Sequence, residues 1–280
     1  MKHYIKLSAF FVFLFIAPVS LAWNTLGHMV VANIAYQYLT PPAREKVDEL
    51  VNYFNQEYPA INSFPALADW ADELREQKIE TYAHWHYIDM PFSNDGTPLK
   101  NIADTDNAVW ALTNIQIALA NKHANNYERA RFLGFFAHIV ADLHQPLHTT
   151  SRLSTEHPNG DEGGNLYFII YHGDRINLHK IWDEGLGTLT ESSSSEHVNA
   201  LSASIISHYP ESYFGKSAND LNPTDWVQEG NDHAKTYVYD TPEEATPAQA
   251  YFDEGTKLTE QELALAGYRL AHFLNQLLTS

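Results

Sequence analysis

Apolar residues recur at helical spacing along most of the chain after residue 22. In residues 27–39, the apolar positions Val30, Val31, Ile34 and Tyr38 fall on one face, because a helix completes a turn in about 3.6 residues. The same kind of spacing predicts helices over residues 41–54, 66–77, 102–121, 127–143, 194–208 and from 223 onward. The pattern therefore predicts a mainly α protein, built as a multi-helix bundle.

Local signals mark the ends of two of these helices. Thr40 and Pro41 have the residue types of an N-cap and a first helical turn, so they predict where the second helix begins. The last helix is predicted to begin at Thr259, because Thr259-x-x-Glu262 is a capping-box pattern, and to run to about Leu278.

One segment has the pattern of strands. Residues 166–171 are rich in aromatic and β-branched side chains, and Gly173-Asp174 before a short return predicts a turn. We therefore expect a β-hairpin over residues 165–177. Residues 188–195 and 239–255 are expected to be loops. Because no repeat and no long linker interrupts the chain, residues 23–280 are predicted to form a single domain.

The first 22 residues have the pattern of a secretory signal peptide. Lys2 and Lys6 precede an apolar stretch over residues 7–17, and Ser20-Leu21-Ala22 is a small-residue cleavage site. The apolar stretch is too short to cross a bilayer in the ordinary way, because a spanning helix needs about 20 residues. We therefore expect residues 1–22 to be removed, with no stable membrane insertion afterwards and a secreted or periplasmic location.

The charge balance bears on the partners of the protein. The 280-residue chain has 17 basic and 35 acidic side chains, a net charge of −18, and loss of the two lysines before residue 23 would make it −20. Such a surface disfavours non-specific binding to nucleic acid, although bound divalent cations reverse the charge locally. With no cysteine, the chain has neither disulfides nor thiolate metal ligands.

Two His/Asp pairs at helical spacing indicate metal binding. His138 and Asp142 are four residues apart, as are His179 and Asp183, so each pair lies on one helix face. His148 follows the first pair, just after Gln145-Pro146. Imidazole with carboxylate is a ligand set suited to zinc and neighbouring metals.

Further residues complete a recognisable pattern. In chain order, the motifs resemble the zinc-dependent single-strand-specific nucleases and 3′-nucleotidases of fungi, plants and bacteria, to which bacterial zinc phospholipase C is distantly related. The motifs are Trp23 with His28, Trp70-Ala-Asp72-Glu-Leu-Arg75, His86-Tyr-Ile-Asp89, His138 through His148, and Gly163-Gly-Asn165 before His179-Lys-Ile-Trp-Asp183. The resemblance covers the chain from Trp23 onward.

The resemblance implies three Zn²⁺ ions in a cleft. The first ion would be held by Asp72, His86 and His138, and the second by His28 with the amino nitrogen and carbonyl oxygen of Trp23. Asp142 would be shared by these two ions. The third ion would be held by His148, His179 and Asp183. Two close metals acidify a shared water, so no side-chain base need be sought.

The resemblance also implies roles for residues around the metals. Arg75 would be a catalytic phosphate clamp beside Asp142, because forked guanidinium donors match phosphate oxygens; the alternative for Arg75 is a surface ion pair with Asp72. Tyr87 and Asp89 resemble a base-binding pair, to which Asn165 adds an amide. An aromatic face stacks on any base, whereas a duplex must first flip one out; the alternative for Tyr87 is packing in the core.

Two features lie outside this pattern. The stretch over residues 149–162 is longer than in the fungal members, which concerns the shape of the substrate cleft. His84 and His144 match no ligand position, and His144 is expected behind the ligands or at the surface.

We therefore expect a monomeric zinc-dependent endonuclease acting on single-stranded DNA and RNA, with 5′-phosphate products, and on 3′-mononucleotides. One alternative is a phosphodiesterase of the phospholipase C type, although the last ligand pair here ends in Asp183 where those enzymes have Glu. Another is a secreted metal-binding protein without catalysis, against which Arg75 beside the ligands argues.

Overall fold

The computed structural model describes residues 23–279. The predicted signal peptide, residues 1–22, lies outside the described residues. The α-helices are α1 (Thr25–Tyr38), α2 (Pro41–Asn55), α3 (Phe64–Glu76), α4 (Ala108–Ala120), α5 (Asn126–Asp142), α6 (Leu178–Asp183), α7 (Ser195–His208), α8 (Glu211–Phe214), α9 (Pro223–His233) and α10 (Gln249–Thr279). Short 3₁₀ or π turns are η1 (Glu80–His86), η2 (Pro146–His148), η3 (Gly185–Gly187), η4 (Ser217–Asn219) and η5 (Ala234–Val238). The prediction of a mainly α fold is confirmed.

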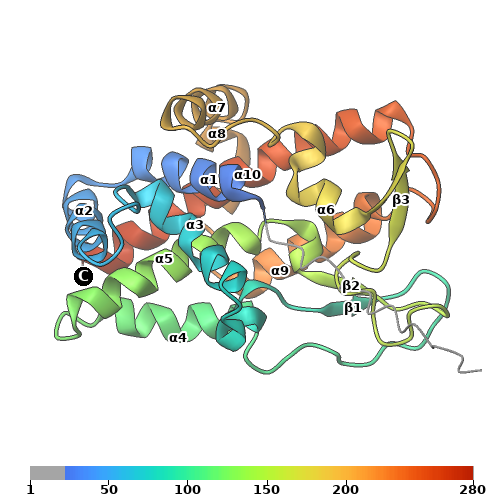
Figure 1. The fold of residues 1–280 in the computed structure, drawn as a ribbon, viewed down its shortest axis with the longest axis horizontal. Coiled ribbons are helices and arrows are strands. Elements are labelled where there is room, and N and C mark those ends of the chain that lie inside the picture. Colours follow the sequence, from blue (N-terminus) through green and yellow to red (C-terminus); the bar gives the residue numbers. More distant parts are fainter. Residues whose placement is uncertain (1–22, 280) are drawn as a thin grey trace, which may run out of the picture.

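The helices pack around α1, α5 and α10 (Figure 1). α1 lies against α10, α3 and α7, while α5 lies against α3, α4 and α2. The long α10 approaches α1 closely at Gly267, where a Cβ atom would collide with the side chain of Ile34. This packing holds α1, α3 and α5 together, and these three helices carry four of the predicted ligands, His28, Asp72, His138 and Asp142.

Two small sheets lie beside the bundle. β3 (Phe168–Tyr171) and β4 (Asp174–Asn177) form the predicted hairpin, with Phe168 opposite Asn177, and β4 leads directly into α6. β1 (Met90–Phe92) pairs in parallel with β2 (Thr150–Arg152). This second pair, which the sequence pattern did not predict, joins the segment after His86 to the start of residues 149–162.

The buried apolar residues form two clusters. The larger one includes Trp23, Trp70 and Phe135 and fills the helical bundle. The smaller one includes Leu147, Trp182 and Tyr239 and lies under the hairpin and α6. The ligand-bearing helices α1, α3 and α5 pack into the larger cluster, whereas η2 and α6 pack into the smaller one, so the two clusters fix the ligands of the two sides.

Three local predictions were wrong. α4 begins at Ala108 and not at 102, because the Asn107 side chain caps it by accepting from the N–H groups of Val109 and Trp110. α10 begins at Gln249, so residues 249–255 are not a loop. Thr259 is a buried mid-helix residue and not a cap.

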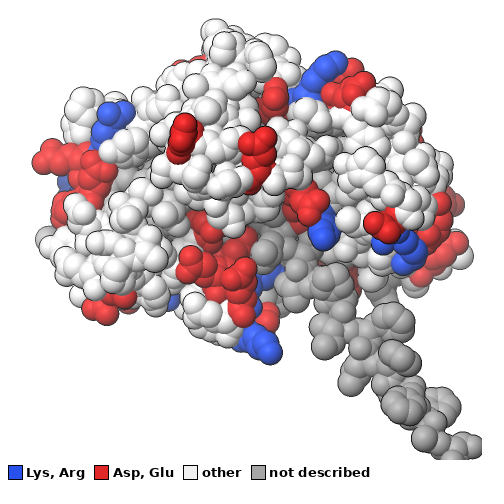
Figure 2. Space-filling view, turned by 45° about the horizontal axis from the view of Figure 1, so that its top comes forward, with Lys and Arg blue, Asp and Glu red and all other residues white. Residues whose placement is uncertain are grey.

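Acidic side chains outnumber basic ones on the face shown in Figure 2, as the net charge of −18 leads one to expect. Within the described residues, none of the helices combines the length and the apolar character needed to cross a membrane.

Candidate metal centre

A first cluster of ligand-type side chains comes from four elements. His28 lies on α1, Asp72 on α3, His86 at the end of η1, and His138 and Asp142 on α5. One carboxylate oxygen of Asp142 lies 3.5 Å from His28 Nε2; the other lies 3.3 Å from His138 Nε2 and 3.2 Å from His86 Nδ1. Asp142 therefore stands at the centre of the cluster, facing all three imidazoles.

Two overlapping groups within this first cluster could each hold an ion. They are His28 with His138 and Asp142, and Asp72 with His86 and His138. In each group, the three candidate ligand atoms lie within 4.8 Å of one another. Asp72 Oδ1 lies 3.6 Å from both His86 Nδ1 and His138 Nε2.

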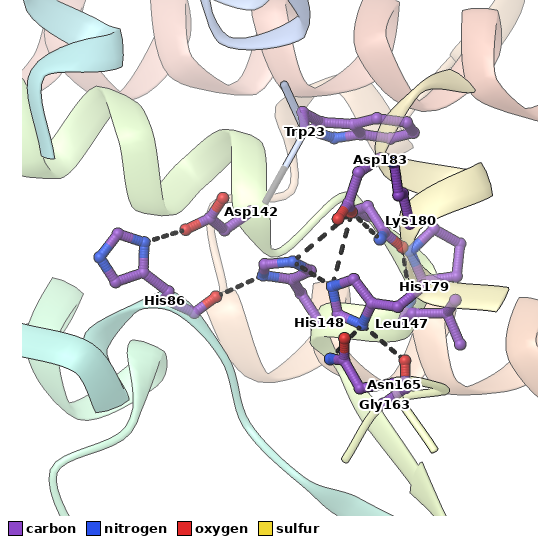
Figure 3. A network of polar contacts seen from close by, with 12 residues as sticks. Trp23, His86, Asp142, Leu147, His148, Gly163, Asn165, His179, Lys180 and Asp183 are labelled. Carbon is purple, nitrogen blue, oxygen red and sulfur yellow. Dashed lines mark hydrogen bonds and ion pairs between the residues drawn. The ribbon is translucent and has the colours of Figure 1, made fainter. Parts of the chain in front are cut away.

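A second cluster consists of His148, His179 and Asp183, and it forms the third such group. His148 ends η2, whereas His179 and Asp183 lie four residues apart on α6. The Nε2 atoms of the two histidines are 3.0 Å apart, and Asp183 Oδ1 lies 3.5 Å from His179 Nε2 (Figure 3). The structure thus brings together all eight side chains that were predicted to bind metal.

Backbone carbonyls set the orientation of three of the imidazoles. The Nδ1 atoms lie 2.8 Å from Ala68 O for His138, 2.7 Å from His86 O for His148 and 2.6 Å from Gly163 O for His179. Because a carbonyl oxygen only accepts, each Nδ1 carries the proton and donates. In the neutral form of each ring, Nε2 is unprotonated and faces its cluster, which is how protein frameworks orient metal-binding histidines.

The electrostatics of the first cluster favour a cation. Burial opposes the charged form of His138, but the carboxylates of Asp142 and Asp72 outweigh it and raise its pKa to about 9. Burial raises the pKa of Asp72 to about 7 and lowers that of His86 to about 4. A buried carboxylate pair that holds a proton among imidazoles can hold a metal cation in its place.

The polar atoms of the first cluster fit a metal. Both ring nitrogens of His28, Oδ1 of Asp72 and both carboxylate oxygens of Asp142 are buried without a hydrogen-bond partner. Unsatisfied buried polar atoms are costly, and a cation bound among these side chains would give most of them a partner. In the second cluster, burial lowers the pKa of His148 and of His179, which keeps both neutral as ligation requires.

Exposure differs across the centre. His28, His138 and Asp142 are fully buried, whereas His148, His179 and Asp183 keep 3–5% of their surface accessible. Asp72 of the first cluster is also 5% accessible, so solvent reaches the centre at Asp72 and at the second cluster.

Trp23 lies between the two clusters. Its indole is fully buried and donates to Ala141 O at 3.1 Å, one residue before Asp142. The next residue, Asn24, donates its N–H to Asp183 O at 3.1 Å. These two contacts hold Trp23 between the end of α5 and α6.

The positive charge of Arg75 acts on both clusters. Burial lowers the pKa of His86, His148 and His179, and the positive charge of Arg75 adds to this effect at all three. Its Nε atom is buried without a hydrogen-bond partner. The ion pair with Asp72 that the sequence spacing allows is not formed within the described part of the chain.

Tyr87 and Asp89 lie beside the centre in acidic surroundings. Tyr87 is half-buried. Its ring packs edge-to-face against the ring of His84, with 6.1 Å between the two ring centroids. Burial, together with the negative charges of Asp104 and Glu162, raises the pKa of Tyr87 to about 12 and that of Asp89 to about 7. His84 itself is an exposed residue that contacts Asp104 and Asp106.

Asn165 is next to the second cluster. Its Nδ2 atom donates to Glu162 O at 2.9 Å and lies 3.2 Å from His179 Nδ1, while its buried Oδ1 has no hydrogen-bond partner. Asn165 therefore has an acceptor available close to His179 (Figure 3).

Sequence reasoning missed one contact of the centre. Gln145 was interpreted only as part of a helix stop, yet its Nε2 donates to Asp183 Oδ1 at 2.7 Å and its Oε1 accepts from Leu147 N–H at 2.6 Å. The sequence feature that could have indicated this contact is the position of Gln145 inside the motif from His138 to His148. The surface alternative for His144 was wrong: the residue is buried and contacts Arg269 Nη1 at 2.9 Å.

Comparison with known proteins agrees with this geometry. Residues 23–279 match the family model described as S1/P1 nuclease. Nuclease P1 of Penicillium citrinum is 26% identical over 281 residues, covering 91% of this chain and 97% of that protein. Nuclease S1 of Aspergillus oryzae is 25% identical over 287 residues, covering 93% of each. Endonuclease 4 of Arabidopsis thaliana is 26% identical over 293 residues, covering 93% of this chain and 91% of that protein.

The match defines the class of this protein as a hydrolase of the nuclease type. More particularly, the chain belongs to the S1/P1 nuclease family, which confirms the resemblance predicted from the motifs.

Proposed function

We propose that this protein is a zinc-dependent endonuclease that hydrolyses single-stranded DNA and RNA to products ending in 5′-phosphate. It also releases phosphate from 3′-mononucleotides. The observation that carries the proposal is the arrangement of three His/Asp groups around a single centre, with the charge of Arg75 acting on histidines of both clusters. Family membership supports nucleic acid as the substrate.

The three groups suit three zinc ions, since zinc prefers imidazole and carboxylate ligands. Asp72, His86 and His138 would hold one ion, and His28 with the main chain of Trp23 would hold another, with Asp142 shared between them. The second cluster would hold the third. Bound zinc supplies Lewis acidity at the phosphate and at an attacking water.

The neighbouring side chains bind and orient the substrate. The guanidinium of Arg75 donates to phosphate oxygens as negative charge develops on them. The ring of Tyr87 stacks on a base, which every base allows, and Asp89 accepts from the edge of that base. Asn165 presents its free Oδ1 to the substrate beside His179.

These roles favour single strands. Stacking on Tyr87 requires a base that is free of its own stack, and a duplex supplies one only at a cost of a few kcal/mol. The acidic surface disfavours sequence-independent binding along a duplex, so the substrate is held mainly at the centre.

The proposal includes processing and location. Removal of residues 1–22 as a signal peptide would place the mature protein, a monomer beginning at Trp23, in the periplasm or outside the cell. The pattern of the first 22 residues supports this part of the proposal.

Purified protein beginning at Trp23 tests the proposal. Metal content is measured, and hydrolysis is followed on denatured DNA, duplex DNA, RNA and a 3′-mononucleotide, with and without chelator. We expect three zinc ions, loss of activity with chelator, its return with zinc, a strong preference for denatured DNA, and 5′-phosphate ends. Products with 3′-phosphate ends, or equal rates on duplex and denatured DNA, would contradict the proposal. Hydrolysis of lecithin in place of DNA would favour the phospholipase alternative.

A further inference from the structure

The turn before the hairpin has an unusual backbone. Glu162, Gly163 and Gly164 follow one another with φ values of +56°, +61° and +83°. A Cβ atom at Gly163 would collide with the carbonyl oxygen of Leu147, so this position requires glycine. Glu162 has a Cβ atom and adopts the left-handed region at an energetic cost. A turn of this kind persists only where its surroundings hold it.

The turn has a direct connection to the second cluster. The carbonyl oxygen of Gly163 lies 2.6 Å from Nδ1 of His179 and accepts its proton. This contact leaves His179 Nε2 facing His148 Nε2 at 3.0 Å and Asp183 Oδ1 at 3.5 Å. The orientation of one predicted ligand thus depends on the conformation of the turn.

Asp161 immediately precedes this turn and holds it in place. Its side chain is fully buried, and its carboxylate accepts from the backbone N–H of Arg152 at 2.9 Å and from the hydroxyl of Tyr239 at 2.8 Å. The backbone N–H of Gly164 also donates to it. A buried carboxylate is costly unless its oxygens are hydrogen-bonded, and here the donors come from β2, from the turn itself and from the end of η5.

We propose that Asp161 and Tyr239 are positioning residues for the metal group formed by His148, His179 and Asp183. Tyr239 fixes the carboxylate of Asp161, Asp161 fixes the turn, and the turn aims the Gly163 carbonyl at His179. The inference rests on the proposed function only in requiring that this group binds zinc.

The chain offers a matched pair of variants. Tyr239→Phe removes the hydroxyl that donates to Asp161. Tyr167→Phe is the control, because Tyr167 is similarly buried and its ring lies 5.2 Å from that of Tyr239. The Tyr167 hydroxyl donates at 2.8 Å to Thr241 O and not to Asp161. Both variants lose one buried hydroxyl hydrogen bond in the same part of the fold.

The measurement is the number of zinc ions retained as a competing chelator is added. In Tyr239→Phe we expect one of the three ions to leave at about tenfold lower chelator concentration, in line with the effect of residues that orient metal ligands. Asp161→Asn should act in the same direction, whereas Tyr167→Phe should follow the unsubstituted protein. Thermal unfolding of the zinc-free forms should not separate the two Tyr→Phe variants.

His179→Ala identifies the affected ion. Because that variant already lacks the third group, adding Tyr239→Phe to it should cause no further loss of zinc. Equal zinc retention by the two Tyr→Phe variants, or further loss in the double variant, would overturn the inference. The readout is zinc and not hydrolysis, so three zinc ions without nuclease activity in the unsubstituted protein would contradict only the proposed function.

Discussion

Nδ1 of His148 donates to the backbone carbonyl oxygen of His86 at 2.7 Å (Figure 3). The ring of His86 belongs to the first cluster, 3.2 Å from Asp142, while its carbonyl orients a residue of the second cluster. One residue therefore connects the two clusters, and we expect metal binding in one to affect the other.

His86→Ala should weaken both clusters. The variant loses a ligand of the first cluster, and the carbonyl that orients His148 is no longer fixed by a metal-bound ring. We expect one zinc ion to be lost and the second-cluster ion to leave at about tenfold lower chelator concentration. Asp72→Ala is the control, since it removes a first-cluster ligand without a backbone contact to His148. Equal retention of the second-cluster ion in both variants would contradict the coupling.

Asp142→Asn should be among the most damaging substitutions. The carboxylate of Asp142 faces His28 with one oxygen and His86 and His138 with the other, so loss of its charge weakens two metal positions at once. We expect about one zinc ion to remain, in the second cluster, and hydrolysis to fall by more than about 10³-fold. Metal analysis and single-stranded DNA hydrolysis check this. Full zinc content with near-normal turnover would mean that Asp142 does not bridge two ions.

Arg75→Ala should separate metal binding from catalysis. Arg75 contributes a positive charge near both clusters but no ligand atom, so the variant should keep its three zinc ions. We expect kcat to fall by about 10²–10³-fold, the usual loss when a donor to the transition state is removed. Arg75→Lys keeps the positive charge but not the forked donor geometry of the guanidinium, so it should recover only part of the lost kcat. If Arg75→Ala lost zinc, or changed only KM, the phosphate clamp would be the wrong role.

The helices could be predicted because their apolar spacing is long and regular. α1 and α5 start and end within two residues of the predicted bounds. The start of α10 could not be predicted in the same way. Thr259-x-x-Glu262 is a local cap signal, whereas the structure buries Thr259 beside Gly185, and tertiary packing outweighs the local pattern. The pairing of β1 with β2 joins two three-residue strands far apart in sequence, and strands so short leave no periodic signal.

The centre could be predicted only in part from spacing. Helical geometry alone brings His138 to Asp142 and His179 to Asp183. The positions of His28, Asp72 and His86 depend on how separate elements pack, so only the resemblance to a family placed them in the same site. The contact from Gln145 to Asp183 also depends on tertiary structure, which no pattern along the chain encodes.

Asp104→Asn should shift the pH dependence of hydrolysis. Burial raises the pKa of Asp89 to about 7, and the negative charges of Asp104, Asp161 and Glu162 add to this effect. As pH rises through that pKa, Asp89 becomes a carboxylate that accepts from a base edge, so kcat/KM for guanine-containing substrates should rise. Removing the negative charge of Asp104 lowers the pKa of Asp89, so the rise in kcat/KM should move to lower pH. Asp106→Asn is the control, because Asp106 also contacts His84. An identical inflection in all three proteins would contradict the role of Asp89.

Addition of a single residue before Trp23 should impair the centre. A free α-amino group has a pKa of about 8 and can give up its proton to a metal near neutral pH. Together with the carbonyl of the same residue, it forms a five-membered chelate that only a first residue can offer. The contacts of Trp23 with Ala141 and of Asn24 with Asp183 hold this residue between the two clusters.

In a form with one extra alanine before Trp23 we expect two zinc ions and loss of most activity, because an amide nitrogen replaces the amine. Trp23→Phe at the free terminus is the control: it keeps the amine and carbonyl and should keep three ions, with lower stability from the lost packing. Three zinc ions and full turnover in the extended form would show that Trp23 only packs against the core.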